Sequence, residues 1–222
     1  MAGPAPASPG TTVLPDDHVY GDPDAPVTVL EYGDYQCPYC SAVAPVLREL
    51  VDTSEGRVRL VFRNFPLPDL HPFALTAALA AEAAGAQGAF WPMHHLLFTK
   101  QARLTDAALR SYAEHLGLDA DLVVGEPAQV HGDKVEADFA AGLEAGVPGT
   151  PTLFVDGVRY QGRPDLASLR RAVTGAGRGS PGQAGLQPRP RRERRGLRLR
   201  RAQREAVAEE PQDEGAEQRR EQ

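Results

Sequence analysis

The only two cysteines of this 222-residue chain lie three positions apart, in Cys37-Pro38-Tyr39-Cys40. Cysteines at positions i and i+3 of one helical turn face the same side, where they can meet disulfide geometry. The pair directly follows Val27–Tyr32, a run rich in β-branched residues that predicts a strand. A C-x-x-C pair between a strand and a helix is typical of a thiol–disulfide redox site.

The two cysteines are predicted to have different roles. Cys37 lies at the start of a predicted helix, where free backbone N–H groups and the helix dipole favour a thiolate, so we assign it as the attacking nucleophile. Cys40 lies one turn further on and is expected to be buried and to resolve the mixed disulfide. Pro38 suits a helix start because it has no N–H to leave unpaired. Tyr39 is neutral, which indicates a reduction potential near the glutaredoxin range of roughly −200 to −230 mV.

Two other uses of the cysteine pair are an inert disulfide and a metal site. Structural disulfides are rare in the cytosol, where we expect this chain to reside. A metal site needs two further Cys or His ligands, and the six histidines show no suitable spacing. We therefore expect a redox pair with no metal, and no dissociable cofactor, because the two sulfurs hold the exchanged electrons.

Charge and hydropathy limit the range of partners. The net charge is −6, but residues 175–222 hold 12 Lys+Arg and 8 Asp+Glu, which leaves 12 and 22 in residues 1–174. Such an acidic body argues against a nucleic-acid partner. No run approaches the roughly 18 apolar residues of a membrane span. Met1–Thr12 lacks the basic and apolar regions of a secretory signal, so we expect a cytoplasmic location.

Hydrophobic periodicity predicts an α/β fold whose two parts are separated by helices. Strands are expected at Val27–Tyr32 and Val58–Phe65, and a hairpin at residues 152–160 turns on Asp156-Gly157. Amphipathic helices are expected at residues 38–53 and from Asp165 onward, with only helical patterns between the two strand regions. The predicted organisation is a flexible leader (1–17), a first part (18–65), an all-helical insertion (66–146), a second part (147–174) and a disordered charged tail (175–222).

Two motifs more than 100 residues apart carry a family resemblance. The chain resembles the DsbA-like branch of the thioredoxin superfamily over roughly residues 18–174. The motifs are Glu31-Tyr32-Gly33-Asp34-Tyr35-Gln36-Cys37-Pro38-Tyr39-Cys40 and Val147-Pro148-Gly149-Thr150-Pro151-Thr152-Leu153-Phe154-Val155, supported by Arg63-Asn64-Phe65-Pro66 and Phe90-Trp91-Pro92-Met93-His94. The resemblance implies a thioredoxin fold with a helical insertion and a thiol–disulfide oxidoreductase. Its substrates would be protein thiols and disulfides, with glutathione or another thiol protein as redox partner.

The resemblance also implies a second half of the site. It places Pro151 in a cis peptide bond facing the cysteines, so that Thr150 and Pro151, together with Pro38 and Tyr39, would contact an extended substrate chain. Glu31, six residues before Cys37, is either a solvent-exposed carboxylate at a strand edge or a buried one that takes a proton from Cys40. The resemblance favours the buried carboxylate.

Two functions from other classes stay open at this point. A redox-sensing or binding module would use the same fold but oxidise once and stop. A glutathione-dependent transferase also uses this fold with a helical insertion, but it needs only one activating group, so Cys40 would be dispensable. Turnover of a generic disulfide and the need for Cys40 distinguish the three functions.

Overall fold

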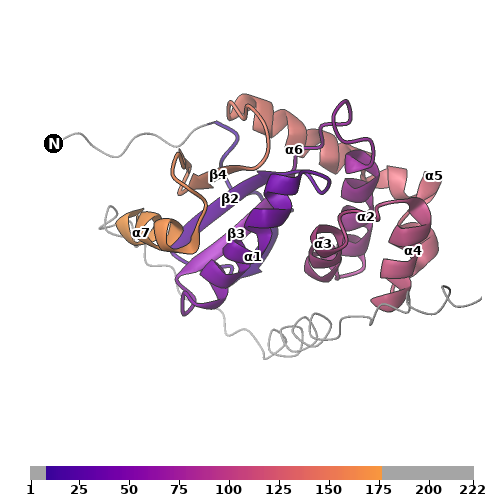
Figure 1. Ribbon diagram of the computed structural model, residues 1–222, viewed down its shortest axis with the longest axis horizontal. Helices are drawn as coiled ribbons and strands as arrows, with labels where there is room; N and C mark the ends of the chain where they lie inside the picture. The colour runs from indigo at the N-terminus through magenta and orange to yellow at the C-terminus, as the bar shows by residue number, and fades with distance from the viewer. Residues whose placement is uncertain (1–8, 177–222) are drawn as a thin grey trace, which may run out of the picture. The chain divides into compact units, whose positions relative to one another are not determined.

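The computed structural model describes residues 9–176, which contain a five-stranded sheet in the order β1-β3-β2-β4-β5 (Figure 1). The strands are β1 (His18–Gly21), β2 (Val27–Gly33), β3 (Val58–Asn64), β4 (Thr152–Val155) and β5 (Val158–Arg159). β2 and β3 are parallel and are joined through α1 (Pro38–Asp52), whereas every other pair of neighbours is antiparallel. The predicted α/β thioredoxin fold is confirmed, and Asp156 and Gly157 form the tight turn of the β4–β5 hairpin with positive φ angles.

Helices cover both faces of the sheet (Figure 1). α1 and α7 (Leu166–Ala176) lie over one face, where Leu47 and Leu169 pack with the inward-facing residues of β2, β3 and β4. α6 (Gly132–Glu144) lies over the other face, and Phe139 stacks on Phe65 there. The alternation of side chains along β2 therefore sends Val29 and Glu31 toward α1, and Leu30 and Tyr32 toward α6.

The segment between β3 and β4 is helical in the structure. It contains α2 (Ala74–Ala86), α3 (Phe90–Thr99), α4 (Asp106–His115), α5 (Gly125–Ala128) and α6, with short 3₁₀ turns η1 (Ala120–Leu122) and η2 (Gln129–His131). α5 and both 3₁₀ turns were absent from the sequence-based expectation, because pieces of three or four residues carry no readable period. Within residues 9–176, none of the helices combines the length and apolarity that crossing a membrane requires.

β1 was not expected from the sequence. Its four residues pair antiparallel with β3, with His18 opposite Phe62, and too few residues are involved to show an alternating pattern. The edge that β1 presents is partly covered, since the Trp91 ring N–H donates to the Val19 carbonyl at 3.0 Å. Helix α3 of the insertion thus covers part of the edge strand β1, whose backbone groups would otherwise be unpaired.

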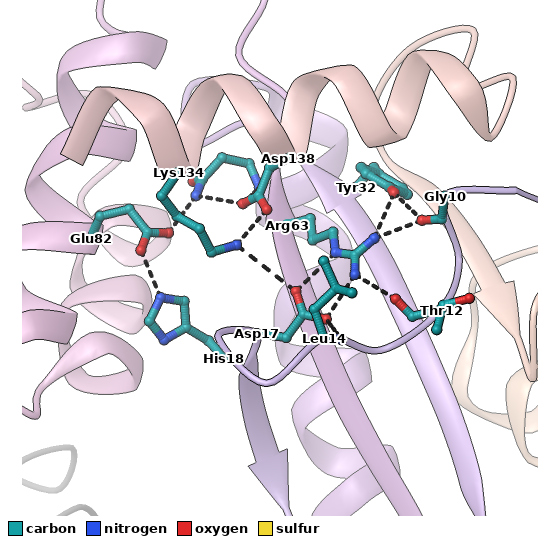
Figure 2. Close-up of polar contacts among 11 residues, drawn as sticks. Gly10, Thr12, Leu14, Asp17, His18, Tyr32, Arg63, Glu82, Lys134 and Asp138 are labelled. Carbon is teal, nitrogen blue, oxygen red and sulfur yellow. Dashed lines mark hydrogen bonds and ion pairs between the residues drawn. The ribbon is translucent and has the colours of Figure 1, made fainter.

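The chain before β1 forms what we call the N-terminal strap, residues 10–17. These residues were placed in a flexible leader by composition, but the strap packs on the sheet; residues 1–8 and the predicted tail beyond Ala176 lie outside the described part. The reason is Arg63, whose side chain is 1% exposed. Its guanidinium makes two bonds to Asp17, at 2.8 and 2.9 Å, and donates to the carbonyls of Gly10 and Thr12 (Figure 2). A buried guanidinium needs such partners.

The same polar network continues into the insertion (Figure 2). Lys134 on α6 pairs with Asp138 and lies 3.9 Å from Asp17. Glu82 on α2 accepts from the Asn64 amide at 2.6 Å and pairs with His18 at 2.8 Å. Strap, sheet, α2 and α6 are therefore joined by one set of buried polar contacts.

We expect Asp17→Ala to lower the free energy of unfolding by about 3–5 kcal/mol, because it leaves Arg63 as a buried charge without its carboxylate. Asp16→Ala is the matched control, since Asp16 is the exposed neighbour in the same strap. Urea unfolding of both variants measures the difference. Equal losses would contradict the account of why the strap is held.

Candidate active site

The cysteine pair lies at the N-terminus of α1, directly after β2. Cys37 is the N-cap residue, with an extended backbone (φ −73°, ψ 120°), and Pro38 begins the helix. Cys37 is 3% exposed, Cys40 is fully buried, and both are free thiols. Tyr39 between them is 73% exposed, so its side chain lies open to any molecule that approaches Cys37.

The two thiols have opposite electrostatic environments. The pKa of Cys37 is lowered to about 5, above all because Cys40 donates a hydrogen bond to its sulfur, with help from Thr150 and the backbone N–H groups of Cys40 and Tyr39; burial acts in the opposite direction. The pKa of Cys40 is raised, first by burial, then by its bond to Cys37 and by the charge of Glu31. At neutral pH the arrangement holds one nucleophilic thiolate and one protonated thiol.

Glu31 lies fully buried on the α1 side of β2. Neither of its carboxylate oxygens has a hydrogen-bond partner among residues 9–176. Its pKa is raised to about 8, first by burial and then by the negative charge of Cys37. The space beside Glu31 is so narrow that residue 33 must be glycine. A Cβ at Gly33 would lie 2.4 Å from the Phe62 ring and 3.3 Å from a Glu31 oxygen. A carboxyl group in such a place is poised to exchange a proton near neutral pH.

A loop from the far end of the chain completes the site. The Thr150–Pro151 peptide bond is cis, and the Cys37 sulfur lies 3.4 Å from the Thr150 carbonyl oxygen, to which it can donate a hydrogen bond only when it is protonated. β4 follows this loop and pairs with β2, with Thr152 opposite Tyr32, which brings the loop beside the start of α1. The Thr150 side chain is close enough to Cys37 to help lower its pKa. The structure thus brings together the sequence-predicted residues Glu31, Cys37–Cys40, Thr150 and Pro151.

Asp34 organises the loop that leads into Cys37, and the sequence reasoning missed it. Its carboxylate accepts from the backbone N–H groups of Gln36 at 2.7 Å and Leu67 at 2.9 Å, and it contacts the His71 ring at 2.8 Å. Its carbonyl accepts from the Cys37 N–H at 3.1 Å. The available signal was an aspartate three residues before the helix N-cap, in a position typical of a side chain that bonds to the backbone two residues after it.

Aromatic side chains pack against the loop that connects β2 to α1. Tyr35 is fully buried against Phe62 and Phe98, and its hydroxyl lies 3.1 Å from Nδ1 of His94 on α3. The pKa of His94 is lowered to about 3, first by burial and then by the nearby His95 and His18. His94 is therefore a neutral partner of Tyr35 at physiological pH.

The neutral state of His94 makes stability depend on pH. Below about pH 6.5 the unfolded chain binds a proton at this residue that the native protein does not accept until about pH 3. The free energy of unfolding should therefore fall as pH drops through this window, by up to about 1.4 kcal/mol per pH unit. We expect His94→Gln to flatten this dependence, whereas His115→Gln, at an exposed position, should keep it. Chemical denaturation at several pH values measures both, and parallel curves for native protein and His94→Gln would contradict the prediction.

Comparison with known proteins places this geometry in a family. The family described as "Thioredoxin" matches residues 13–174. The chain belongs to the thioredoxin family. This confirms the superfamily that the sequence motifs indicated. Among the side chains of residues 9–176, no group of three or more His, Cys, Asp or Glu could hold a metal ion.

Solved structures agree with the fold. BdbD from Bacillus subtilis superposes with a TM-score of 0.66 at 24% identity, covering 78% of this chain and 99% of that one. A thioredoxin-like oxidoreductase from Silicibacter pomeroyi superposes with a TM-score of 0.65 at 29% identity, covering 75% of this chain and 95% of that one.

Two relatives with high sequence similarity to this chain are named as antiporters and not as oxidoreductases. A protein named Na(+)/H(+) antiporter NhaA 1 from Salinispora arenicola is 46% identical over 201 residues, which are 90% of this chain and 30% of that protein. A protein named Na(+)/H(+) antiporter NhaA 3 from Salinispora tropica is 47% identical over 166 residues, 74% of this chain and 25% of that protein. The chain thus spans less than a third of the length of these relatives.

Proposed function

We propose that the protein is a thiol–disulfide oxidoreductase that acts on protein substrates through Cys37 and Cys40. The observation that carries the proposal is the pairing of a thiol whose pKa is lowered with a buried thiol whose pKa is raised, one helical turn apart and beside the Thr150 carbonyl. The membership in the thioredoxin family, the resemblance of the motifs to the DsbA-like branch and the likeness to the oxidoreductase from Silicibacter pomeroyi support the same chemistry.

The reaction proceeds by two exchanges. The Cys37 thiolate attacks one sulfur of a substrate disulfide, which breaks that bond, forms a mixed disulfide and releases the first substrate thiolate. Cys40 then loses its proton and attacks the Cys37 sulfur. That step breaks the mixed disulfide, releases the second substrate thiolate and leaves the Cys37–Cys40 disulfide. The substrate gains two electrons and the protein loses them; glutathione or another thiol protein restores the dithiol, and the whole sequence runs in reverse for oxidation.

Glu31 is proposed to take the proton from Cys40. While Cys37 is a thiolate, its negative charge helps to keep Glu31 protonated. Formation of the mixed disulfide removes that charge, which lowers the pKa of Glu31 and makes its carboxylate available when Cys40 must lose a proton. The buried position beside the cysteines supports this timing, because few solvent molecules could serve instead.

Pro38, Tyr39, Thr150 and Pro151 are proposed to contact the substrate. Tyr39 is the exposed side chain next to Cys37, and the Thr150 carbonyl lies at the attacking sulfur. An extended peptide lying along this loop would bring its own cysteine to Cys37 while pairing through its backbone.

The test is catalysed turnover of a protein disulfide, such as those of insulin, with a small thiol as the electron source. We expect many substrate disulfides to be exchanged per molecule. A single oxidation followed by no further reaction would favour a redox-sensing module, a second candidate that the antiporter names of the Salinispora relatives raise. Full activity without Cys40 would favour a glutathione-dependent transferase.

The cytoplasmic location stays a prediction. One protein of similar fold, from Salmonella enterica, is a periplasmic thioredoxin-like protein. Fractionation of cells that express the full-length gene product, with a probe for this region, would decide the compartment. Recovery in the periplasm would contradict the prediction.

A further inference from the structure

We propose that Gln101 is a positioning residue through which the helical insertion holds the first turn of α1 and sets the reactivity of Cys37. The inference deepens the proposed function and rests on it. Gln101 lies in the connection between α3 and α4, more than 60 residues after Cys37 in the sequence, and nothing in the sequence motifs marks it.

The Gln101 side chain donates two hydrogen bonds to the active-site loop. The Gln101 side-chain amide donates one hydrogen to the Cys37 carbonyl at 2.8 Å and the other to the Tyr35 carbonyl at 2.9 Å. An amide group has two hydrogens, so both are used on the two residues that flank Gln36. The half-buried side chain therefore clamps the loop into the helix start from the side of the insertion.

A second hydrogen bond joins α1 to α3 close to the Gln101 contacts. The Ser41 hydroxyl on α1 donates to the Phe98 carbonyl at the end of α3, at 3.1 Å. The Ser41 N–H itself donates to the Cys37 carbonyl at 3.2 Å, as the first bond of α1. The Cys37 carbonyl thus accepts both a donor of its own helix and the amide of Gln101. We infer that the insertion fixes the plane of this peptide group.

The position of that peptide group matters for the sulfur. The backbone N–H groups of Tyr39 and Cys40 help to lower the pKa of Cys37, and their direction depends on how the first turn of α1 is held. Both partners of the Gln101 amide are carbonyl oxygens, so a carboxylate at residue 101 could accept nothing from them and would repel the thiolate.

The experiment compares Gln101→Leu and Gln101→Glu with Gln87→Leu. Gln87 is a matched control because it is another half-buried insertion glutamine that bonds to backbone, donating to the carbonyl and accepting from the N–H of Asp119, far from the cysteines in sequence. The readouts are the pKa of the Cys37 thiol, followed by thiolate absorbance, and the equilibrium of the cysteine pair with glutathione. Thermal unfolding of all variants reports any general loss of stability.

We expect Gln101→Leu to raise the pKa of Cys37, because the N–H groups that stabilise its thiolate would be held less firmly, and to shift the glutathione equilibrium toward the disulfide form by about threefold to tenfold. Gln101→Glu should shift both further, and Gln87→Leu should leave both unchanged. An unaltered pKa and equilibrium in Gln101→Leu, or an equal shift in Gln87→Leu, would overturn the inference. If the native protein itself shows neither a lowered Cys37 pKa nor disulfide exchange, the proposed function fails first, and the two failures are thereby distinguished.

Discussion

Cys40→Ala is expected to hold substrate proteins in a stable mixed disulfide, whereas Cys37→Ser forms none and loses turnover by on the order of 10³-fold or more. Cys37 carries the lowered pKa and lies beside the Thr150 carbonyl, so it alone is prepared to attack. Cys40 is fully buried and donates a hydrogen bond to the Cys37 sulfur, so its removal blocks the second exchange, whereas the first attack needs only Cys37.

The measurement is a non-reducing gel with mass spectrometry of the trapped species, alongside turnover of insulin disulfides. Glu49→Gln is a useful control, because Glu49 lies at an exposed position on α1, about three helical turns from Cys37. Traps that form through Cys40 in the Cys37→Ser variant would reverse the assigned roles. Undiminished turnover in Cys40→Ala would show that a second thiol is unnecessary.

Glu31→Gln is expected to slow release of the mixed disulfide by about 10²-fold near neutral pH, while the first attack by Cys37 keeps its rate. The reason is that glutamine cannot take the proton that Cys40 must lose. Single-turnover kinetics separate the two steps, since the mixed disulfide should accumulate only in the variant. Glu49→Gln, at an exposed position on α1, is the control. Equal rates of release in Glu31→Gln and native protein across pH would exclude the proton-transfer role.

The same substitution has a signature in stability. Glu31 has its pKa raised to about 8 in the native protein against 4.5 when unfolded. The stability that its neutral form contributes is full below about pH 4.5 and is lost as pH rises toward 8, by up to about 1.4 kcal/mol per pH unit. The lowered pKa of Cys37 acts in the opposite sense, but it is present in both proteins and largely cancels in their difference. Stability of Glu31→Gln relative to native protein should therefore rise with pH across this window, and a constant difference would contradict the burial of an uncharged carboxyl.

The chemistry of this site could be predicted from sequence because its signals are local. Cys37 and Cys40 are three residues apart after a clear strand, and Thr150-Pro151 precedes a second strand, so the family motifs identified both halves. The positions of α1, β2, β3 and the β4–β5 hairpin followed from the same short-range periodicities. The structure adds that Glu31 is fully buried. Alternation along a strand separates its two faces, but it does not tell which face is buried.

The parts that were missed depend on long-range contacts. β1 exists because β3 offers it a partner, and the N-terminal strap is held because Arg63 is buried and needs Asp17. The sequence of β1 does not indicate that β3 is its partner, and the sequence around Asp17 does not indicate Arg63, because each pair lies about 40 or more positions apart. Gln101 carries no motif at all, yet its amide reaches two carbonyls of the active-site loop. Polar contacts of this kind become visible only when the fold brings distant segments together.

The measurement that tests the central claim most directly is the equilibrium of the Cys37–Cys40 pair with a glutathione buffer. The pKa of Cys37, at about 5, lies between the roughly 3.5 of DsbA and the roughly 7 of thioredoxin. We therefore predict a single two-electron couple at roughly −180 to −230 mV, which includes the range expected from Tyr39 alone. A couple near the −120 mV of DsbA or the −270 mV of thioredoxin would contradict the electrostatic account of Cys37. The absence of any two-electron couple would contradict the redox site itself.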